Sequence, residues 1–280
     1  MSRDLSLSST FRLSSGHDMP ILGFGVWRVP GPAVMGPVKA ALDTGYRHID
    51  SAIMYRNEEE LGKVVRDSGI KRDELFITSK VGSRYHGSQS ASKAIEQSLQ
   101  RFQLGYLDLF LIHDPLSGKR KRLDTWRVLI QKRDEGKLRS IGVSNYGVRH
   151  LEEIREAGLE LPAVNQIELH PWCQQRPIVD YCKNNGIVVQ AYCPLTQGVY
   201  LNEPILAELS KKYNKDHAQI LIRWSLQMGY SPLPKSEKPS RILSNSQVYD
   251  FQLSEEDMKA LNALDLGADG ATSWNPVNVA

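Results

Sequence analysis

Eight short apolar runs, each followed by a segment of helical periodicity, restrict the fold of this chain more than any other feature. The runs are rich in β-branched residues, which is typical of buried strands. They span residues 23–27, 47–51, 75–80, 107–113, 140–144, 164–169, 188–192 and 231–234. Strands that alternate with helices predict βαβ units and a parallel sheet. Eight such units within 280 residues favour an α/β fold closed into a (β/α)8 TIM barrel.

The segments around these runs complete the predicted architecture. Helical patterns lie at about 33–43, 57–67, 90–102, 121–135, 147–157, 176–185, 203–228 (in two pieces) and 239–247. Residues 11–13 and 19–22 predict an N-terminal β-hairpin that plugs the bottom of the barrel. Ser254, three residues before Asp257, has the spacing of a helix cap and predicts an extra helix over 254–264, followed by an irregular tail. With no linker or repeat, we expect a single domain over 1–280, with the barrel at about 20–250 and the C-terminal helix and tail at 251–280.

Composition excludes several classes of protein. Lys and Arg total 35 against 32 Asp and Glu, a balance that does not favour a nucleic-acid or membrane partner. No run approaches the roughly 18 apolar residues of a membrane-spanning helix. The three cysteines form no CxxC motif, so we expect no disulfide framework and a reducing compartment. These patterns predict a cytoplasmic protein.

Ionisable side chains gather where the predicted strands end. Asp50, Lys80 and His113 end the second, third and fourth runs, and Tyr55 follows Asp50 in the next loop. In a barrel these strand ends meet at one face, where active sites lie. A lysine beside a tyrosine would lower the phenol pKa from about 10, a carboxylate would offset the lysine charge, and a histidine would hold a carbonyl oxygen. The set is therefore suited to protonating a carbonyl oxygen.

Several motifs make the chain resemble one known family. They are GYRHIDSAIMYRNEEELG at 45–62, ITSK at 77–80, LIH at 111–113, GVSN at 142–145 and NQIELHP at 165–171. In this order they resemble the aldo-keto reductase family from about Phe11 to Leu264. The resemblance implies a monomeric, NADPH-dependent reductase of small-molecule aldehydes and ketones. It also implies a catalytic tetrad of Asp50, Tyr55, Lys80 and His113, with Tyr55 as general acid.

The same resemblance implies where the nicotinamide cofactor binds. Ser144, Asn145 and Gln166 would hold the carboxamide, and Tyr192 would stack on the ring. Leu195 and Gln197 would lie on the loop that crosses the pyrophosphate. Lys235, Ser236 and Arg241 would bind the 2′-phosphate and Asn245 the adenine, which favours NADPH over NADH because lysine and arginine at a helix start suit a phosphate dianion. Ser244 departs from the acidic residue that many members carry there.

The predicted substrate pocket departs from the family pattern. Trp27 matches a pocket-wall tryptophan of the family. Gly82 and Asp114, however, stand where many members carry further tryptophans. We therefore expect a wider and more polar pocket and a broad or polar range of carbonyl substrates. The sequence leaves the physiological substrate, the product stereochemistry and the direction of the reaction in the cell open.

Other interpretations stand beside this one. Taken singly, Asp50 could be a helix cap, Lys80 a solvated strand end, His113 a core histidine and Tyr55 a surface residue. One alternative function is a non-enzymatic relative that binds the cofactor with little turnover. The other is a metal-dependent barrel hydrolase, although the sequence has no HxH or HExxH motif and we expect no metal.

Overall fold

The computed structural model describes residues 5–280 and contains one closed sheet of eight parallel strands. Residues 1–4, which the predicted domain includes, lie outside the described residues. The strands are β3 (Phe24–Gly25), β4 (His48–Asp50), β5 (Phe76–Val81), β6 (Leu107–Ile112), β7 (Leu138–Ser144), β8 (Val164–Glu168), β9 (Val188–Tyr192) and β10 (Ser231–Pro232). Neighbours in the sheet are neighbours in the chain. The N–H groups of Gly23 and Gly25 donate to the carbonyl oxygens of Pro232 and Pro234, both at 3.1 Å, and so join β3 to β10.

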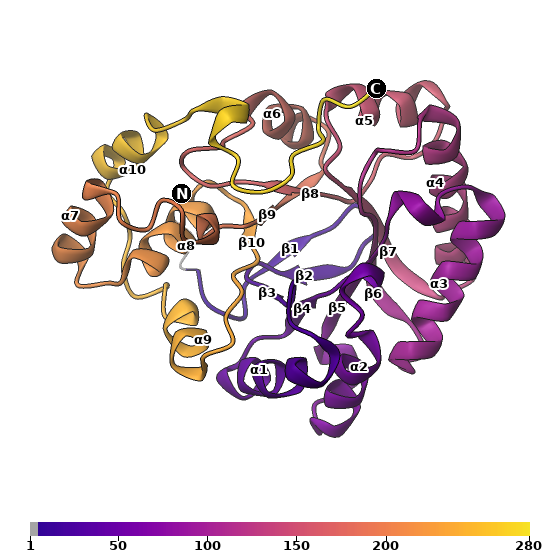
Figure 1. Cartoon of the computed structure of the whole chain (residues 1–280), viewed down its shortest axis with the longest axis horizontal. Helices are drawn as coiled ribbons and strands as arrows, with labels where there is room; N and C mark the ends of the chain where they lie inside the picture. Colours follow the sequence, from indigo (N-terminus) through magenta and orange to yellow (C-terminus); the bar gives the residue numbers. More distant parts are fainter. Residues whose placement is uncertain (1–4) are drawn as a thin grey trace.

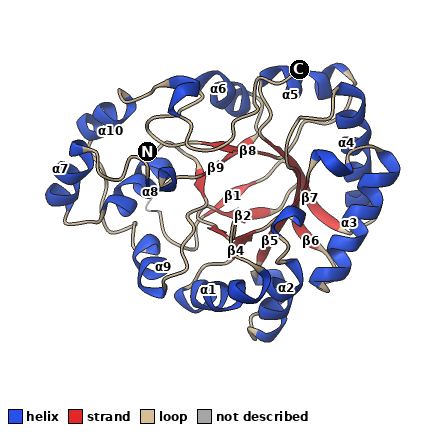
Figure 2. Cartoon of the chain, in the orientation of Figure 1, coloured by secondary structure: helices blue, strands red, loops and turns tan. Residues whose placement is uncertain are grey.

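Helices form an outer ring around these strands, as Figures 1 and 2 show. They are α1 (Gly31–Thr44), α2 (Glu58–Asp67), α3 (Ser88–Phe102), α4 (Lys119–Asp134), α5 (Val148–Glu156), α6 (Arg176–Asn184), α7 (Pro204–Tyr213), α8 (His217–Gln227), α9 (Pro239–Ser246) and α10 (Glu255–Asn262). The predicted (β/α)8 barrel is confirmed, including the division of 203–228 into two helices. Across the described part of the chain, no helix has both the length and the apolar composition needed to cross a membrane.

The first and last strands of the barrel are the shortest, and both are shorter than the sequence predicts. The sequence predicts strands over 23–27 and 231–234, but β3 and β10 contain two residues each. Pro232 and Pro234 carry no backbone N–H, so the last strand cannot complete a hydrogen-bond ladder. The barrel therefore closes through few hydrogen bonds on this side.

The predicted N-terminal hairpin is also present. It pairs β1 (Thr10–Arg12) with β2 (Asp18–Pro20) in antiparallel register. Leu13 and Met19 are buried and pack with inward-facing side chains of the barrel strands, among them Leu109 and Leu111. This contact buries apolar surface that would otherwise be open to water, and it leaves the opposite end of the barrel open.

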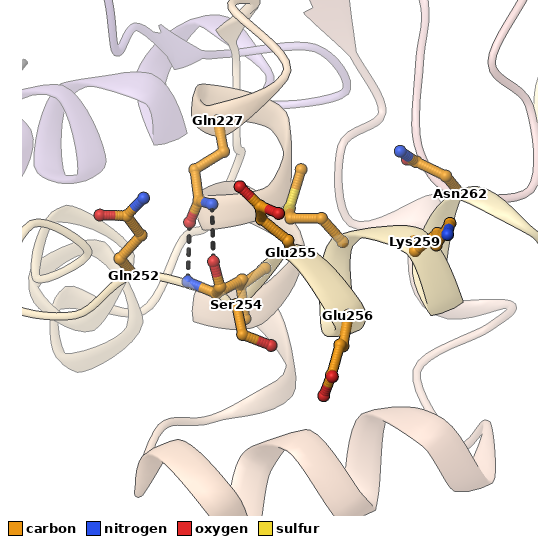
Figure 3. A pocket seen from close by; sticks show the side chains of 9 residues that line it. Gln227, Gln252, Ser254, Glu255, Glu256, Lys259 and Asn262 are labelled. Atoms are coloured by element: carbon orange, nitrogen blue, oxygen red, sulfur yellow. Dashed lines mark hydrogen bonds between the residues drawn. The ribbon is translucent and has the colours of Figure 1, made fainter. Parts of the chain in front are cut away.

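The extra C-terminal helix α10 is held against α8 by a glutamine. Gln227, at the end of α8, accepts a hydrogen bond from the N–H of Leu253 at 2.8 Å and donates one to its carbonyl oxygen at 3.0 Å (Figure 3). The Ser254 hydroxyl then accepts from the N–H of Asp257 at 3.2 Å, which caps the helix as its spacing predicts. The chain leaves α10 toward the open end of the barrel.

Two helical glycines give a test of the packing between helices. A Cβ on Gly62 of α2 would overlap the backbone of Phe102 in α3, whereas a Cβ on exposed Gly36 of α1 would meet nothing within 4 Å. We expect Gly62→Ala to lower the free energy of unfolding by about 1–3 kcal/mol through overpacking. Gly36→Ala should raise it by about 0.5–1 kcal/mol through helix propensity. Urea unfolding measures both, and equal stability of the two variants would contradict the close contact of α2 with α3.

Candidate active site

A buried ion pair lies at the end of the barrel where the strands β4 and β5 finish. The Lys80 Nζ donates to Asp50 Oδ1 at 2.5 Å and to the carbonyl oxygen of Ser51 at 2.9 Å. The Lys80 side chain has no exposed surface. Gln166 Nε2 donates to the other oxygen of Asp50 at 2.9 Å. The carboxylate is thus bonded on both oxygens, which offsets much of the cost of burying charge.

Tyr55 is the third partner of the Lys80 Nζ. Its hydroxyl lies 3.5 Å from Nζ, at the end of the short 3-10 helix Ile53–Tyr55 that follows β4. An ammonium has three N–H groups, and Asp50, Ser51 and Tyr55 provide three acceptors. Because the phenol oxygen accepts from Lys80, its own proton is free to be donated elsewhere.

Asn57 fixes the loop that carries this tyrosine. Its buried side chain accepts a hydrogen bond from the Ser51 hydroxyl at 2.7 Å and donates to the carbonyl oxygens of Val26 and Val29 at 3.2 and 2.9 Å. The loop after β4 is therefore tied to the loop after β3. This tie holds Tyr55 in one place relative to the barrel.

The pKa of Tyr55 differs from the sequence-based expectation. Part of the ring faces open space, but the surrounding protein desolvates the hydroxyl, and this raises its pKa well above the usual value, with Asp50 raising it further. The expectation of a phenol pKa below about 10 is therefore wrong for the free protein, in which desolvation has the largest effect on this pKa. The hydroxyl therefore keeps its proton at neutral pH, which is the state that a proton donor requires.

His113 follows β6 and faces the same space. Its ring lies edge-on to Tyr55, with ring centroids 5.8 Å apart. The backbone N–H of His113 donates to the carbonyl oxygen of Val81 at 2.8 Å, and its backbone carbonyl oxygen accepts from Asn145 Nδ2 at 3.0 Å. Burial lowers the pKa of His113 well below the usual value, and Lys80 and His86 lower it further. The imidazole is therefore neutral at physiological pH.

These groups open onto a cavity of about 680 Å³ at the barrel mouth. Eleven of the predicted site residues line it: Trp27, Asp50, Tyr55, His113, Ser144, Asn145, Gln166, Tyr192, Leu195, Gln197 and Lys235. Lys80 lies behind this lining, where it contacts Asp50 and Tyr55. Most of the predicted site is thus brought together by the fold.

Polar groups from three strands converge beside Tyr55. The Ser144 hydroxyl donates to the carbonyl oxygen of Gln166 at 2.8 Å, and the Tyr192 hydroxyl donates to Asn145 Oδ1 at 2.8 Å. Asn145 has a φ of +61°, a left-handed conformation that asparagine tolerates better than most residues. Asn145 lines the cavity together with Ser144, Gln166 and Tyr192.

Other predicted residues lie elsewhere. Ser236, Arg241 and Asn245 are not part of the cavity lining and lie on or just before α9. Gly82 and Asp114 are not part of this lining either, so their assignment to the substrate pocket stays a prediction. The Asp114 carboxylate instead accepts from the N–H groups of Ser83 and Leu116, both at 3.1 Å, and holds that loop together.

Sequence reasoning also missed part of the wall. Met54, with 63% of its surface exposed, and Trp274, with 54%, line the cavity along with Trp27. The neighbouring residues Thr272 and Ser273 line it as well. Met54 could have been found from its position beside Tyr55. The C-terminal residues carry no periodic pattern that would place them there.

Comparison with known proteins identifies the family. A model described as the aldo/keto reductase family matches residues 22–266. The chain belongs to this family. It is 47% identical over 260 residues to a glyoxal reductase of Bacillus subtilis (strain 168), across 92% of this chain and 94% of that protein. A crystal structure of an aldo/keto reductase from Brucella melitensis has a TM-score of 0.88 at 40% identity and covers 92% of this chain and 99% of its own.

A further structural relative carries a cofactor. The crystal structure of a Bombyx mori aldo-keto reductase in complex with NADP has a TM-score of 0.88 at 33% identity, covering 93% of this chain and 94% of that chain. Aldo-keto reductases use nicotinamide cofactors and reduce carbonyl groups, and this chain is an oxidoreductase of that kind. Among residues 5–280, no group of three or more His, Cys, Asp or Glu side chains is arranged to hold a metal ion.

Buried histidines make the stability of this protein depend on pH. Burial lowers the pKa of His48 to about 4 and also lowers those of His86, His113 and His150. The unfolded chain takes up protons at these rings below about pH 6.5 while the folded chain does not, so acid favours unfolding. We expect the free energy of unfolding to fall between pH 7 and pH 5, with a limiting slope of about 1.4 kcal/mol per pH unit for each such ring. Urea unfolding at both pH values checks this, and a constant free energy would contradict it.

Proposed function

We propose that this protein reduces aldehydes and ketones to alcohols with NADPH, with Tyr55 as the proton donor. The observation that carries the proposal is the chain of contacts from Asp50 through Lys80 to Tyr55. Tyr55, the last residue of this chain of contacts, lines the cavity. Its hydroxyl accepts from Lys80, so its own proton remains available for donation to a substrate. His113 faces the same cavity as a neutral ring.

Each of the four side chains has a distinct part in the reaction. Tyr55 donates its proton to the carbonyl oxygen as negative charge develops there. Lys80 donates to the phenolate that remains, and Asp50 offsets the lysine charge. His113, being neutral, has one N–H with which to hold the carbonyl oxygen. NADPH, when bound, supplies the hydride for the carbonyl carbon.

The cavity lining fits a nicotinamide cofactor. At one end, the side chains of Ser144, Asn145 and Gln166 provide the donors and acceptors that a carboxamide needs. Tyr192 provides a ring face beside them. Leu195 and Gln197 line the cavity on the loop after β9 and are suited to a pyrophosphate crossing there.

A lysine in the cavity lining supports the choice of NADPH. Lys235 lines the cavity, and its Nζ lies 2.5 Å from Glu237. A 2′-phosphate would compete with Glu237 for this ammonium. Ser236 and Arg241 flank the start of α9, where backbone N–H groups also favour an anion, and Asn245 on the same helix would face the adenine. NADH has no phosphate at this position.

The expected substrates are small, polar carbonyl compounds within a broad range. Buried carboxylate, hydroxyl and amide groups line part of the cavity, while Trp27, Met54 and Trp274, together with Pro194, Leu195 and Leu233, provide an apolar wall. The similar Bacillus subtilis protein is named a glyoxal reductase, and glyoxal is small and carries two carbonyl groups. Both observations support a dicarbonyl among the substrates.

A substrate panel tests the proposal directly. Purified protein is mixed with glyoxal, methylglyoxal or a bulky apolar aldehyde, with NADPH or NADH, and the absorbance of the reduced nicotinamide is followed. We expect faster consumption of NADPH than of NADH, and turnover of both dicarbonyls. A strict preference for the bulky aldehyde would contradict the polar range, and no consumption with any carbonyl would favour a cofactor-binding role without turnover.

Tyr55→Phe should separate chemistry from cofactor binding. Loss of the proton donor is expected to lower kcat/KM by about 10²–10⁴-fold, the usual contribution of a general acid. The affinity for NADPH, measured by fluorescence titration, should change little, because the hydroxyl acts on the substrate. Tyr85→Phe, outside the cavity lining, is the control and should retain activity. An equal loss of NADPH affinity in Tyr55→Phe would argue against the role of Tyr55.

A further inference from the structure

The C-terminal tail, residues 267–280, runs across the open end of the barrel. Figure 1 shows it in yellow, passing from α10 over the ends of β8 and β9 toward α5. Its middle part, residues 271–276, includes three residues of the cavity wall, Thr272, Ser273 and Trp274. The tail therefore forms part of the site without belonging to the barrel.

A buried carboxylate holds this middle part. Glu168, the last residue of β8, has no exposed surface. One of its oxygens accepts from the N–H of Thr272 at 2.6 Å and from its hydroxyl at 2.7 Å. The other accepts from the N–H of Ser273 at 3.1 Å and from its hydroxyl at 2.6 Å. Two consecutive residues are thus bound through both backbone and side chain, which fixes the register of the tail.

His170 completes the surroundings of Glu168. Its Nε2 lies 3.1 Å from the Oε1 of Glu168, and both side chains are fully buried. Burial alone would raise the pKa of Glu168, but the hydrogen bonds from His170, Ser273 and Thr272 together lower it below the usual value. Glu168 is therefore ionised at neutral pH, and its bonds to the tail are charge-assisted.

The segment held by Glu168 contacts residues of the proposed cofactor site. The carbonyl oxygen of Thr272 accepts from Gln197 Nε2 at 2.7 Å. The carbonyl oxygen of Trp274 lies 3.2 Å from the Tyr192 hydroxyl, which also lies 2.8 Å from Asn145 Oδ1. Thr272 and Trp274 are therefore bonded to two residues that line the cavity, Gln197 and Tyr192.

Other contacts hold the tail on both sides of this segment. Before it, Gly270 passes so close to the carbonyl oxygen of Trp172 that a Cβ would overlap it. After it, His150 Nε2 lies 2.8 Å from the carbonyl oxygen of Val279, and Arg122 donates to that of Ala280 at 3.3 Å. Loss of the Glu168 bonds would therefore loosen the middle of the tail and leave both ends attached.

We propose that Glu168 is a positioning residue for substrate binding: it fixes Thr272 and Ser273, and so places Trp274 as a wall of the substrate cavity. This proposal rests on the proposed function. It assigns Glu168 no contact with substrate or cofactor. Its effect on the reaction passes through the tail, so it acts mainly on KM for the carbonyl compound.

The test compares Glu168→Gln with a matched control. Glutamine has the same shape but one acceptor oxygen, so a backbone N–H of the tail would lose its partner. Glu58 of α2 is equally buried and accepts from the hydroxyls of Ser79 and Ser98 and from Arg101, away from the cavity. Glu58→Gln thus reproduces the cost of neutralising a buried, bonded carboxylate without touching the tail.

Three quantities are measured for both variants: melting temperature, hydrogen exchange by mass spectrometry, and steady-state kinetics with NADPH and methylglyoxal. We expect both variants to melt at lower temperature than the unmodified protein. Only Glu168→Gln should exchange faster in residues 271–276 and raise KM, by roughly tenfold, about the effect of one charge-assisted hydrogen bond. Its kcat should stay within about threefold, because Tyr55 and Lys80 are untouched.

A purely structural role gives a different result. If Glu168→Gln melts earlier but leaves both the exchange of 271–276 and KM unchanged, as Glu58→Gln does, the proposal is overturned. Should Glu168→Gln fail to fold, Thr272→Val with Ser273→Ala removes the two hydroxyl donors only. This variant should raise KM by roughly threefold with faster exchange in 271–276, and unchanged values overturn the proposal. Exchange needs no turnover, so absence of reductase activity would reject the proposed function while exchange still decides whether Glu168 holds the tail.

Discussion

The buried contact between Lys80 and Asp50 is the interaction on which the rest of the site depends. Removing two opposite charges from water is costly, and their attraction offsets this cost only when both are well bonded. Here Asp50 is bonded on both oxygens and the Lys80 Nζ has three acceptors. Apolar side chains of similar size at these two positions would stabilise the fold at least as well as the ion pair does. We interpret the pair as the means of holding a cation behind the Tyr55 hydroxyl.

The barrel makes this arrangement available because its parallel strands end at one face. Asp50 and Lys80 lie in β4 and β5 and His113 directly follows β6, and the sheet fixes the distances between these neighbouring strands. The hairpin of β1 and β2 covers the opposite end, so one mouth stays open. Loops after the strands, and the tail that Glu168 binds, line this mouth. The proposed catalytic groups thus lie at the ends of three strands and on the short 3-10 helix that follows β4.

Much of this could be predicted from the sequence, because strand and helix periodicities are local signals. Asp50, Lys80 and His113 were selected from their place at strand ends, and the fold brings them together. The pKa of Tyr55 was misjudged because desolvation depends on everything packed around the hydroxyl. The role of the Asp114 carboxylate in holding its own loop has no local signal in the sequence, because it depends on Ser83, 31 residues away. The sequence predicts an irregular tail but not its place in the cavity wall, because that place depends on Glu168, more than 100 residues earlier in the chain.

The most direct test of the account is a comparison of Lys80→Met with the double variant Asp50→Asn, Lys80→Met. Lys80→Met leaves an unpaired buried carboxylate and should lose about 3–5 kcal/mol of stability in urea unfolding. The double variant buries no charge and should recover most of that loss. Its carbonyl reduction with NADPH should nevertheless remain at least about 100-fold below that of the unmodified protein, because no cation stabilises the Tyr55 phenolate. A stable double variant with near-normal reduction would contradict the claim that the ion pair serves the proton donor.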